Sequence, residues 1–194
     1  MHKGIFILIL SSFVAQQAVA DAPPTIPKSV SELSASLSSL SEACSAKAAD
    51  FASSDHRAIS QSAADRQLAA LQIRSDTQVY GVGHGNRETT EYMMDRMKTQ
   101  ADTDAEASKQ LAGKMGDETD QVTACIASAE DSGKALYSGF KKTRGKNQKM
   151  DEANSLMTAW LVNLKTISKQ TPKGSDEAST GWQRAKTNAE LNAL

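Results

Sequence analysis

Proline is almost missing from this sequence. The stretch from Lys28 to Thr171 contains none, and the four prolines of the chain are Pro23, Pro24, Pro27 and Pro172. Proline disrupts a helix interior because it lacks a backbone N–H and clashes with the preceding turn. A long stretch without proline, rich in alanine and serine, therefore predicts long helices. No run alternates polar and apolar residues as a half-buried strand would.

Aromatic residues are also scarce, at 5% of the chain. Large aromatic side chains usually fill the centre of a thick globular core. Helices that pack side by side through small residues need few of them. This composition therefore favours slender helical packing over a thick core.

Apolar segments long enough to cross a bilayer are missing too. The apolar run Gly4–Val14 is shorter than the roughly 20 residues that a spanning helix needs. His2 and Lys3 precede it, and residues 18–20 (Ala-Val-Ala) have the small-x-small spacing of a signal cleavage site. We therefore predict a secretory signal over residues 1–20, and a periplasmic or secreted protein without a transmembrane segment in its mature chain.

Neither sign of charge is in excess. The chain has 22 lysines and arginines against 23 aspartates and glutamates, for a formal net charge of −1. Nucleic-acid binding depends on an excess of cations that neutralises phosphates. We therefore expect no nucleic-acid partner.

The helices themselves can be placed from the residues that interrupt them. Ser29 and Glu32 have the spacing of a capping box, glycines cluster in residues 81–86, and a second turn falls at residues 144–147. We predict an all-α fold. It is a long antiparallel helical hairpin over about 29–80 and 86–143, with a third helix over about 147–170 packed at its base.

This interpretation also divides the chain into segments. An extended leader is predicted over 21–28, a single helical domain over 29–171, and a polar linker with a short terminal helix over 172–194. The terminal helix is expected from Trp182 to Leu191, and Trp182 would dock on the base or on a partner. Gly113 and Gly116 leave open whether the second helix is continuous, kinked or split.

Apolar residues at steps of three and four predict the buried stripe of each helix. In the first helix they are Val30, Leu33, Leu37, Leu40, Cys44 and Phe51, with Lys47 as a break. The stripe then slips by one residue to Ala52, His56, Ile59, Ala63, Arg66, Ala70, Ile73 and Tyr80. In the second they are Met94, Met97, Ala101, Asp104, Ser108, Leu111, Met115, Glu118, Val122, Cys125, Ala129 and Leu136. In the third they are Met150, Asn154, Met157, Leu161, Leu164 and either Ile167 or Ser168.

The two cysteines are nearly equidistant from the glycine turn. With Gly83 at the centre of the hairpin, a rise of 1.5 Å per residue brings Cys44 and Cys125 to levels about 4.5 Å apart. Disulfide geometry requires Cα atoms roughly 4.4–6.8 Å apart, and thiols outside the cytoplasm are usually oxidised. We therefore predict a Cys44–Cys125 disulfide. The alternative is two buried free thiols.

Residues that would carry catalysis are few. The chain has three histidines, and neither His56 nor His84 has a nucleophile and an orienting acid nearby in the sequence. The glycine cluster follows no strand and precedes no Lys-Ser or Lys-Thr pair, so it does not predict a nucleotide loop. We expect no enzymatic activity and no cofactor.

Three regions remain as candidate contact sites. The first is the hairpin tip with Tyr80, Gly81, Gly83, Gly85 and Tyr92. The second is the basic second turn with Lys141, Lys142, Arg144, Lys146 and Lys149, which suits an acidic partner or an anionic surface, or is a solvated helix end. The third is a thioether cluster that could hold Cu(I), or simply fill the space under the tip. It comprises Met93, Met94, Met97 and His84.

The leading hypothesis is an exported helical protein of the cell envelope that binds another protein. It would act as an adaptor, chaperone, secretion-system subunit or inhibitor, as a monomer or weak homo-oligomer. The first alternative is a periplasmic copper-binding protein. An enzyme of unrecognised type is the second.

Overall fold

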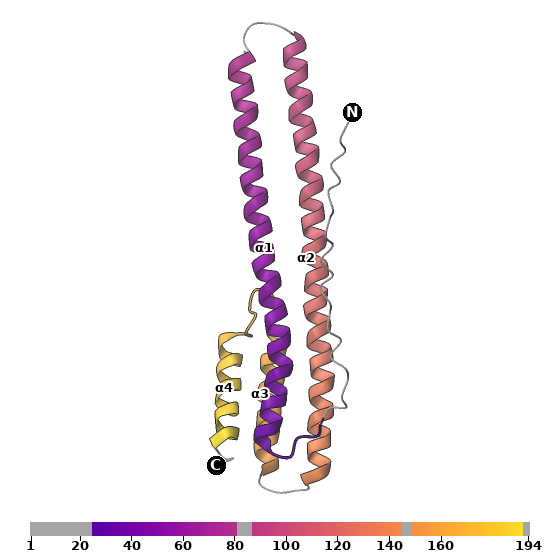
Figure 1. Cartoon of the computed structure of the whole chain (residues 1–194), viewed down its shortest axis with the longest axis vertical. Coiled ribbons are helices and arrows are strands. Elements are labelled where there is room, and N and C mark those ends of the chain that lie inside the picture. Colours follow the sequence, from indigo (N-terminus) through magenta and orange to yellow (C-terminus); the bar gives the residue numbers. More distant parts are fainter. Residues whose placement is uncertain (1–24, 81–86, 145–148, 192–194) are drawn as a thin grey trace, which may run out of the picture.

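The protein is a slender helical rod. The computed structural model describes residues 25–80, 87–144 and 149–191. They contain four helices and no strand: α1 (Val30–Tyr80), α2 (Arg87–Arg144), α3 (Lys149–Lys165) and α4 (Asp176–Leu191). Helices α1 and α2 run antiparallel along the whole rod, whereas α3 and α4 lie beside its lower half (Figure 1). The predicted all-α hairpin with a further helix at its base is confirmed.

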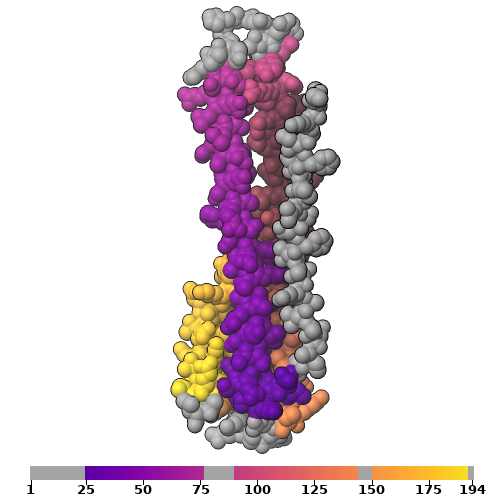
Figure 2. Space-filling view, in the orientation of Figure 1, coloured from indigo at the N-terminus to yellow at the C-terminus, as the bar shows by residue number. Residues whose placement is uncertain are grey.

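The rod therefore has two parts of different thickness (Figure 2). We call the base the part where α3 and α4 cover the hairpin, comprising residues 25–55, 115–144 and 149–191. We call the arm the remaining two-helix part, comprising residues 56–80 and 87–114. Within the part of the chain that the structure describes, none of the helices has the apolar length that a membrane-spanning segment requires. The predicted signal over residues 1–20 lies outside the described residues.

The hydrophobic core lies in the base. Its largest fully buried side chains are Trp160, Phe140, Leu33, Leu37, Leu156 and Leu164. Burying one such side chain contributes roughly 1.5–3 kcal/mol, so this cluster holds α3 against the hairpin. Trp182 of α4 is only 4% exposed and belongs to the same cluster. Trp182 therefore docks on the base.

A close approach of α2 to α3 fixes the position of Trp160. The indole ring lies directly over Gly133, where a Cβ atom would overlap Cη2 and Cζ3 of the ring. Leu37 Cδ2 would lie 3.1 Å from the same Cβ. Only glycine leaves room here, so Gly133 sets how deeply Trp160 inserts between the helices.

Local hydrogen bonds define the helix ends. Ser29 Oγ accepts from the N–H of Glu32 (3.0 Å), and Glu32 Oε2 accepts from the N–H of Lys28 (2.6 Å). This reciprocal cap starts α1 where the sequence predicts it. The expected linker before Trp182 is wrong in part, because α4 begins at Asp176. Ser175 Oγ caps it by accepting from the N–H of Ala178 (3.4 Å).

Helix α3 ends earlier than residue 170. The N–H of Thr166 bonds to Asn163 O (3.0 Å), a tighter turn that stops the α-helix at Lys165. The loop then reverses at Gly174, whose φ of 86° suits glycine. A Cβ at this position would also collide with the buried Asn163 side chain.

The predicted stripe of α1 is correct in the base and wrong in the arm. Ala48 (0% exposed) replaces the expected break at Lys47, which is exposed. Beyond Phe51 the stripe does not slip but keeps its register. Its members there are buried or half-buried, and some of them are polar. They are Asp55, Ala58, Ser62, Ala69, Ile73 and Asp76. The predicted members His56, Ile59, Ala63, Arg66 and Ala70 are exposed instead.

Helix α2 shows the same difference. Its predicted stripe from Asp104 to Leu136 faces inward except at Ser108, but in the arm Met93, Arg96 and Gln100 replace Met94, Met97 and Ala101. Gly113 and Gly116 do not interrupt the helix, which is continuous.

In α3 the predicted Asn154 is exposed. That helix buries a wider face, which includes Ala153, Leu156, Trp160 and Asn163.

Candidate functional site

The disulfide ties the two long helices together within the base. Cys44 and Cys125 are bonded, with their Cα atoms 5.7 Å apart. Cys44 is 1% exposed and belongs to the hydrophobic core. The register predicted from the equal distances to the glycine turn is therefore the register of the hairpin.

A buried charge cluster marks the junction of the base and the arm. Lys169, in the loop after α3, donates from Nζ to Asp55 Oδ2 (2.6 Å) on α1 and to Met115 O (2.9 Å) on α2. Nζ also lies 3.6 Å from Glu118 Oε2. The side chains of Lys169, Asp55 and Glu118 are all at least nine-tenths buried. The α3–α4 loop is thus fastened to both long helices at one point.

A second ammonium balances the charge of this cluster. Lys114 Nζ lies 3.6 Å from Glu118 Oε1 and donates to Ser54 Oγ (3.1 Å). Burial alone would raise the pKa of Asp55. The hydrogen bond from Lys169, with the charge of Lys114 nearby, outweighs burial and holds that pKa below its ordinary value. Asp55 can therefore stay charged although it is buried.

The features of this cluster are those of a structural contact between helices and not those of a reaction centre. Lys169 is already engaged by a carboxylate and a backbone carbonyl, and the group is closed to solvent. No cluster of three or more histidine, cysteine, aspartate or glutamate residues in the described part of the chain is arranged to hold a metal ion. Sequence analysis placed Glu118 in the buried stripe of the second helix but missed Asp55 and Lys169, because charged side chains are normally solvated. The one signal in the sequence was that Asp55 follows Ala48 by seven residues, a spacing that places both on the same face of a helix.

The arm is held by few apolar contacts. Arg96 of α2 forms an ion pair with Asp76 of α1, and Gln100 bonds to Asp104 within α2 (3.0 Å). Met93, 6% exposed, is a buried apolar side chain of the arm. Alanine, serine and charged residues fill most of the remaining interface, so the arm buries much less apolar surface than the base.

Large apolar side chains are nevertheless exposed along the arm. Of the nine that the described residues leave exposed, six lie here, and they are Ile59, Leu68, Leu71, Tyr92, Met94 and Met97. Their exposed fractions range from 47% to 66%. Large apolar side chains exposed together on one part of a protein are typical of contact sites. The arm is therefore the candidate functional site.

The structure places the predicted tip residues only in part. Tyr92 is 64% exposed. Tyr80 ends α1, while Gly81, Gly83, His84 and Gly85 lie outside the described residues.

The predicted thioether cluster does not converge. Met93 points into the interface with α1, whereas Met94 and Met97 are exposed at 66% and 55%. Three thioethers aimed at one point would be needed to favour a Cu(I) site. Here Met94 and Met97 remain as a pair on the arm surface.

The basic second turn lies at the opposite end of the rod. Lys141 and Lys142 are exposed on the last turns of α2. Arg144 and Lys149 are the last residue of α2 and the first of α3, and Lys146 lies outside the described residues. The tip and the basic turn are therefore two separate surfaces.

Comparison with known proteins gives no match. The chain fits no protein-family model, and neither a curated protein nor a solved structure is similar to it. Its function must be argued from its own surfaces.

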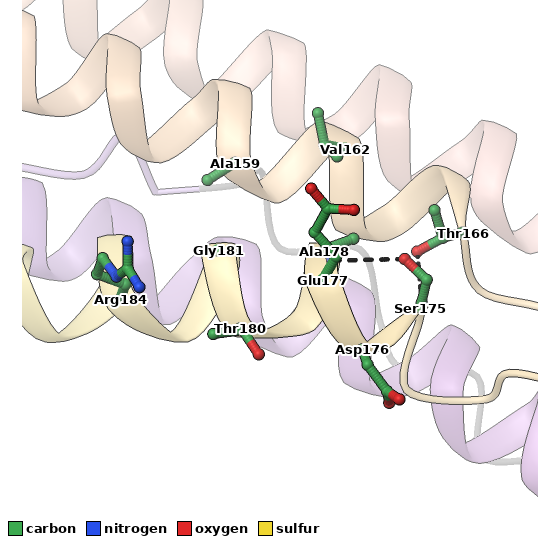
Figure 3. A pocket seen from close by; sticks show the side chains of 10 residues that line it. All are labelled: Ala159, Val162, Thr166, Ser175, Asp176, Glu177, Ala178, Thr180, Gly181 and Arg184. Atoms are coloured by element: carbon green, nitrogen blue, oxygen red, sulfur yellow. Dashed lines mark hydrogen bonds between the residues drawn. The ribbon is translucent and has the colours of Figure 1, made fainter.

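A hollow of the base lies between α3 and α4 (Figure 3). This groove of about 850 Å³ is lined mainly by short side chains, with Val162 53% exposed at its edge. The N–H of Ser175 donates to Thr166 Oγ1 at one end (2.9 Å), and Arg184 extends from α4 at the other. In Figure 3 the acidic and basic side chains of the groove do not point toward one another, so the groove is a weaker candidate for the functional site than the arm.

Proposed function

We propose that this protein is an exported, non-enzymatic adaptor of the cell envelope that binds another protein through its arm. The observation that carries the proposal is the exposed pair Leu68 and Leu71, at 64% and 61%. They are three residues apart on α1 and so lie on neighbouring parts of one helix face. An arm that buries little apolar surface but exposes two neighbouring leucines suits contact with a partner.

The side of α1 that carries this pair is open along the whole rod. Residues 18 apart in an α-helix point in the same direction, because 18 residues make five turns. The equivalents of Leu68 and Leu71 in the base are Asp50 and Ser53, and both are exposed. Helices α3 and α4 therefore lie elsewhere, and a partner could approach the pair along the full length of α1.

The compartment that we predict supports the same role. The sequence pattern of residues 1–20 predicts export, and a disulfide is stable in an oxidising compartment. An elongated molecule with a stable base at one end and a sparsely packed arm at the other suits an adaptor. The base anchors the arm, and the arm extends toward the partner.

Site-specific photo-crosslinking in producing cells tests the proposal. A photoreactive amino acid is placed at Leu68 or Leu71, and the matched control places it at Lys47, an exposed residue on the same helix in the base. The expected result is one discrete adduct with a foreign protein from the arm positions that the control does not give. L68Q/L71Q should lower its yield from a reporter at Tyr92. Equal adduct patterns from the arm and the base would refute the proposal.

Export is tested separately. The amino terminus of the protein recovered outside the cytoplasm should be Asp21, the residue after the predicted cleavage site. An intact Met1 terminus on a protein retained in the cytoplasm would contradict the compartment.

A further inference from the structure

The base has another hollow, between α1 and α4, with a volume of about 320 Å³. We call it the α1–α4 hollow. Helix α4 runs beside the lower part of α1 (Figures 1 and 2). The residues of α4 that line this hollow, Ser179, Trp182, Gln183 and Lys186, follow one another at steps of three and one and share one side of the helix. None of them lines the groove of Figure 3, so the two hollows lie on different sides of α4.

The sequence of α1 explains why space remains here. Beside its leucine stripe, α1 carries serines at steps of four and three. Ser34, Ser38 and Ser41 are buried, and Ser45 is half-buried. Ser41 and Ser45 line the hollow. Because serine is short, a helix packed beside these positions leaves space that a leucine would fill.

A buried amide of α3 also lines the hollow. Asn163 is 4% exposed, and its Oδ1 has no hydrogen-bond partner within the described part of the chain. The α3–α4 loop holds the amide in place, because the backbone of Gly174 lies so close that a Cβ there would overlap Asn163 Oδ1. Buried polar atoms are nearly always hydrogen-bonded. A molecule bound in the hollow would satisfy this amide.

Two ammonium groups line the same hollow. Lys173 belongs to the α3–α4 loop and Lys186 to α4. Neither takes part in a hydrogen bond or an ion pair with any other described residue. Glu42 of α1 is the single acidic residue of the lining. The lining therefore has an excess of one positive charge, which favours an anion.

We propose that the α1–α4 hollow binds a small organic acid through its carboxylate. A carboxylate carries one negative charge and would neutralise the excess of the lining. A phosphate monoester carries about −1.5 to −2 at pH 7 and would leave the hollow negative. Lys173 and Lys186 supply the charge, and rotation of the Asn163 amide by half a turn presents its two N–H donors to a carboxylate oxygen. Trp182 forms an apolar wall for the carbon atoms of the acid.

The volume favours a small molecule. Ligand pockets measure roughly 300–1,000 Å³, and this hollow lies at the lower end of that range. The carboxyl terminus of a peptide is the other source of a carboxylate, but its preceding residues would need additional space. A small acid is therefore the occupant that we assign.

Such a ligand would contact every element around the hollow. Its partners come from α1, α3, the α3–α4 loop and α4, so bound acid would hold α4 to the rest of the base. This inference goes beyond the proposed adaptor role and does not depend on it, because none of the residues involved lies in the arm.

Nuclear magnetic resonance of the labelled protein tests binding and its location together. Lactate is the probe, and lactamide, of similar size but uncharged, is its control at the same ionic strength. The Asn163 side-chain amide and the Trp182 indole N–H should shift with lactate, with one dissociation constant in the millimolar range or below. Lactamide should shift neither group. Inorganic phosphate should bind at least about 10-fold more weakly than lactate.

Matched substitutions test the charges. K173M and K186M should each raise the dissociation constant for lactate about 10-fold, because each removes one of the two ammoniums. E42Q should lower it, because it removes the opposing charge. The control K47M removes an exposed lysine of α1 outside the hollow and should leave it unchanged. Circular dichroism must show equal helicity for all four variants.

Four outcomes would overturn the inference. They are no shift at about 50 mM lactate, equal shifts with lactamide, shifts confined to residues away from the hollow, and an effect of K47M as large as that of K186M. N-acetylglycylglycine tests the other source of a carboxylate, and tighter binding of this peptide than of lactate would overturn the assignment to a small acid. The crosslinking from Leu68 and Leu71 does not involve this hollow, so the two proposals fail independently.

Discussion

Replacing Gly133 by alanine should destabilise the base, although alanine is the better helix former. In an unobstructed helix this change stabilises by about 0.5–1 kcal/mol. At Gly133 the added Cβ overlaps two ring atoms of Trp160, and it lies 3.1 Å from Leu37 Cδ2. Both neighbours are 0% exposed, and side chains in a close-packed interior have little room to move. Overpacking of this kind costs about 1–3 kcal/mol, and two fixed neighbours place the cost near the upper end. The net expectation is a loss of about 2 kcal/mol.

Gly181 provides the matched control. It lies inside α4 in the same base, and a Cβ there meets nothing within 4 Å. G181A should therefore stabilise by about 0.5–1 kcal/mol, opposite in sign to G133A. Urea unfolding followed by tryptophan fluorescence measures both, because Trp160 and Trp182 are the two tryptophans and both are buried in the base.

A double-mutant cycle isolates the contact itself. W160F removes part of the ring, so G133A should cost less in that background than in the natural chain. Equal free energies of unfolding for G133A and G181A would refute the claim that Gly133 sets the depth of Trp160. Additivity of G133A and W160F would refute it as well.

Two further predictions concern the disulfide and the buried ion pair of Lys169 with Asp55. Reducing the Cys44–Cys125 bond should lower the free energy of unfolding by at most about 4.5 kcal/mol, and the helicity in buffer should be kept. Limited proteolysis of the reduced protein should cut first in the arm. Unchanged proteolysis on reduction would contradict this. K169M should destabilise by about 3–5 kcal/mol at pH 7, because it leaves Asp55 buried without its ammonium. The two proteins should also differ in pH dependence. The depressed pKa of Asp55 stabilises the natural protein above about pH 4, and this contribution is lost as pH falls further, whereas K169M should gain stability as pH falls from 7 toward 4. Unfolding curves with parallel pH dependence would exclude the assigned role of Lys169.

The hairpin and its disulfide were predictable because they depend on chain-wide constraints. The absence of proline between Lys28 and Thr171 permits long helices, and the distances of Cys44 and Cys125 from the glycine turn set the register. The arm was mispredicted because some of its large apolar residues, including Met97 and Ile59, are not at the interface between α1 and α2. A periodic pattern shows that a stripe is apolar, but not which neighbour covers it.

The missed residues of the base have other causes. Trp160 lies outside the predicted stripe because α3 is covered by helices on more than one side, so its buried face is wider than one stripe. Lys169 was missed because a single charged residue in a loop carries no periodic signal. The early start of α4 was predictable in principle from Ser175, which has the side chain of a typical N-cap.

The position of the disulfide has a consequence for the order in which the chain can fold. Cys125 follows Cys44 by 81 residues, whereas α3 and α4 begin only at Lys149 and Asp176. During synthesis both thiols therefore exist before either helix that completes the base. Oxidation can close the hairpin before Trp160 packs against Gly133. The bond would then act as a template that holds α1 and α2 at the correct level when α3 arrives.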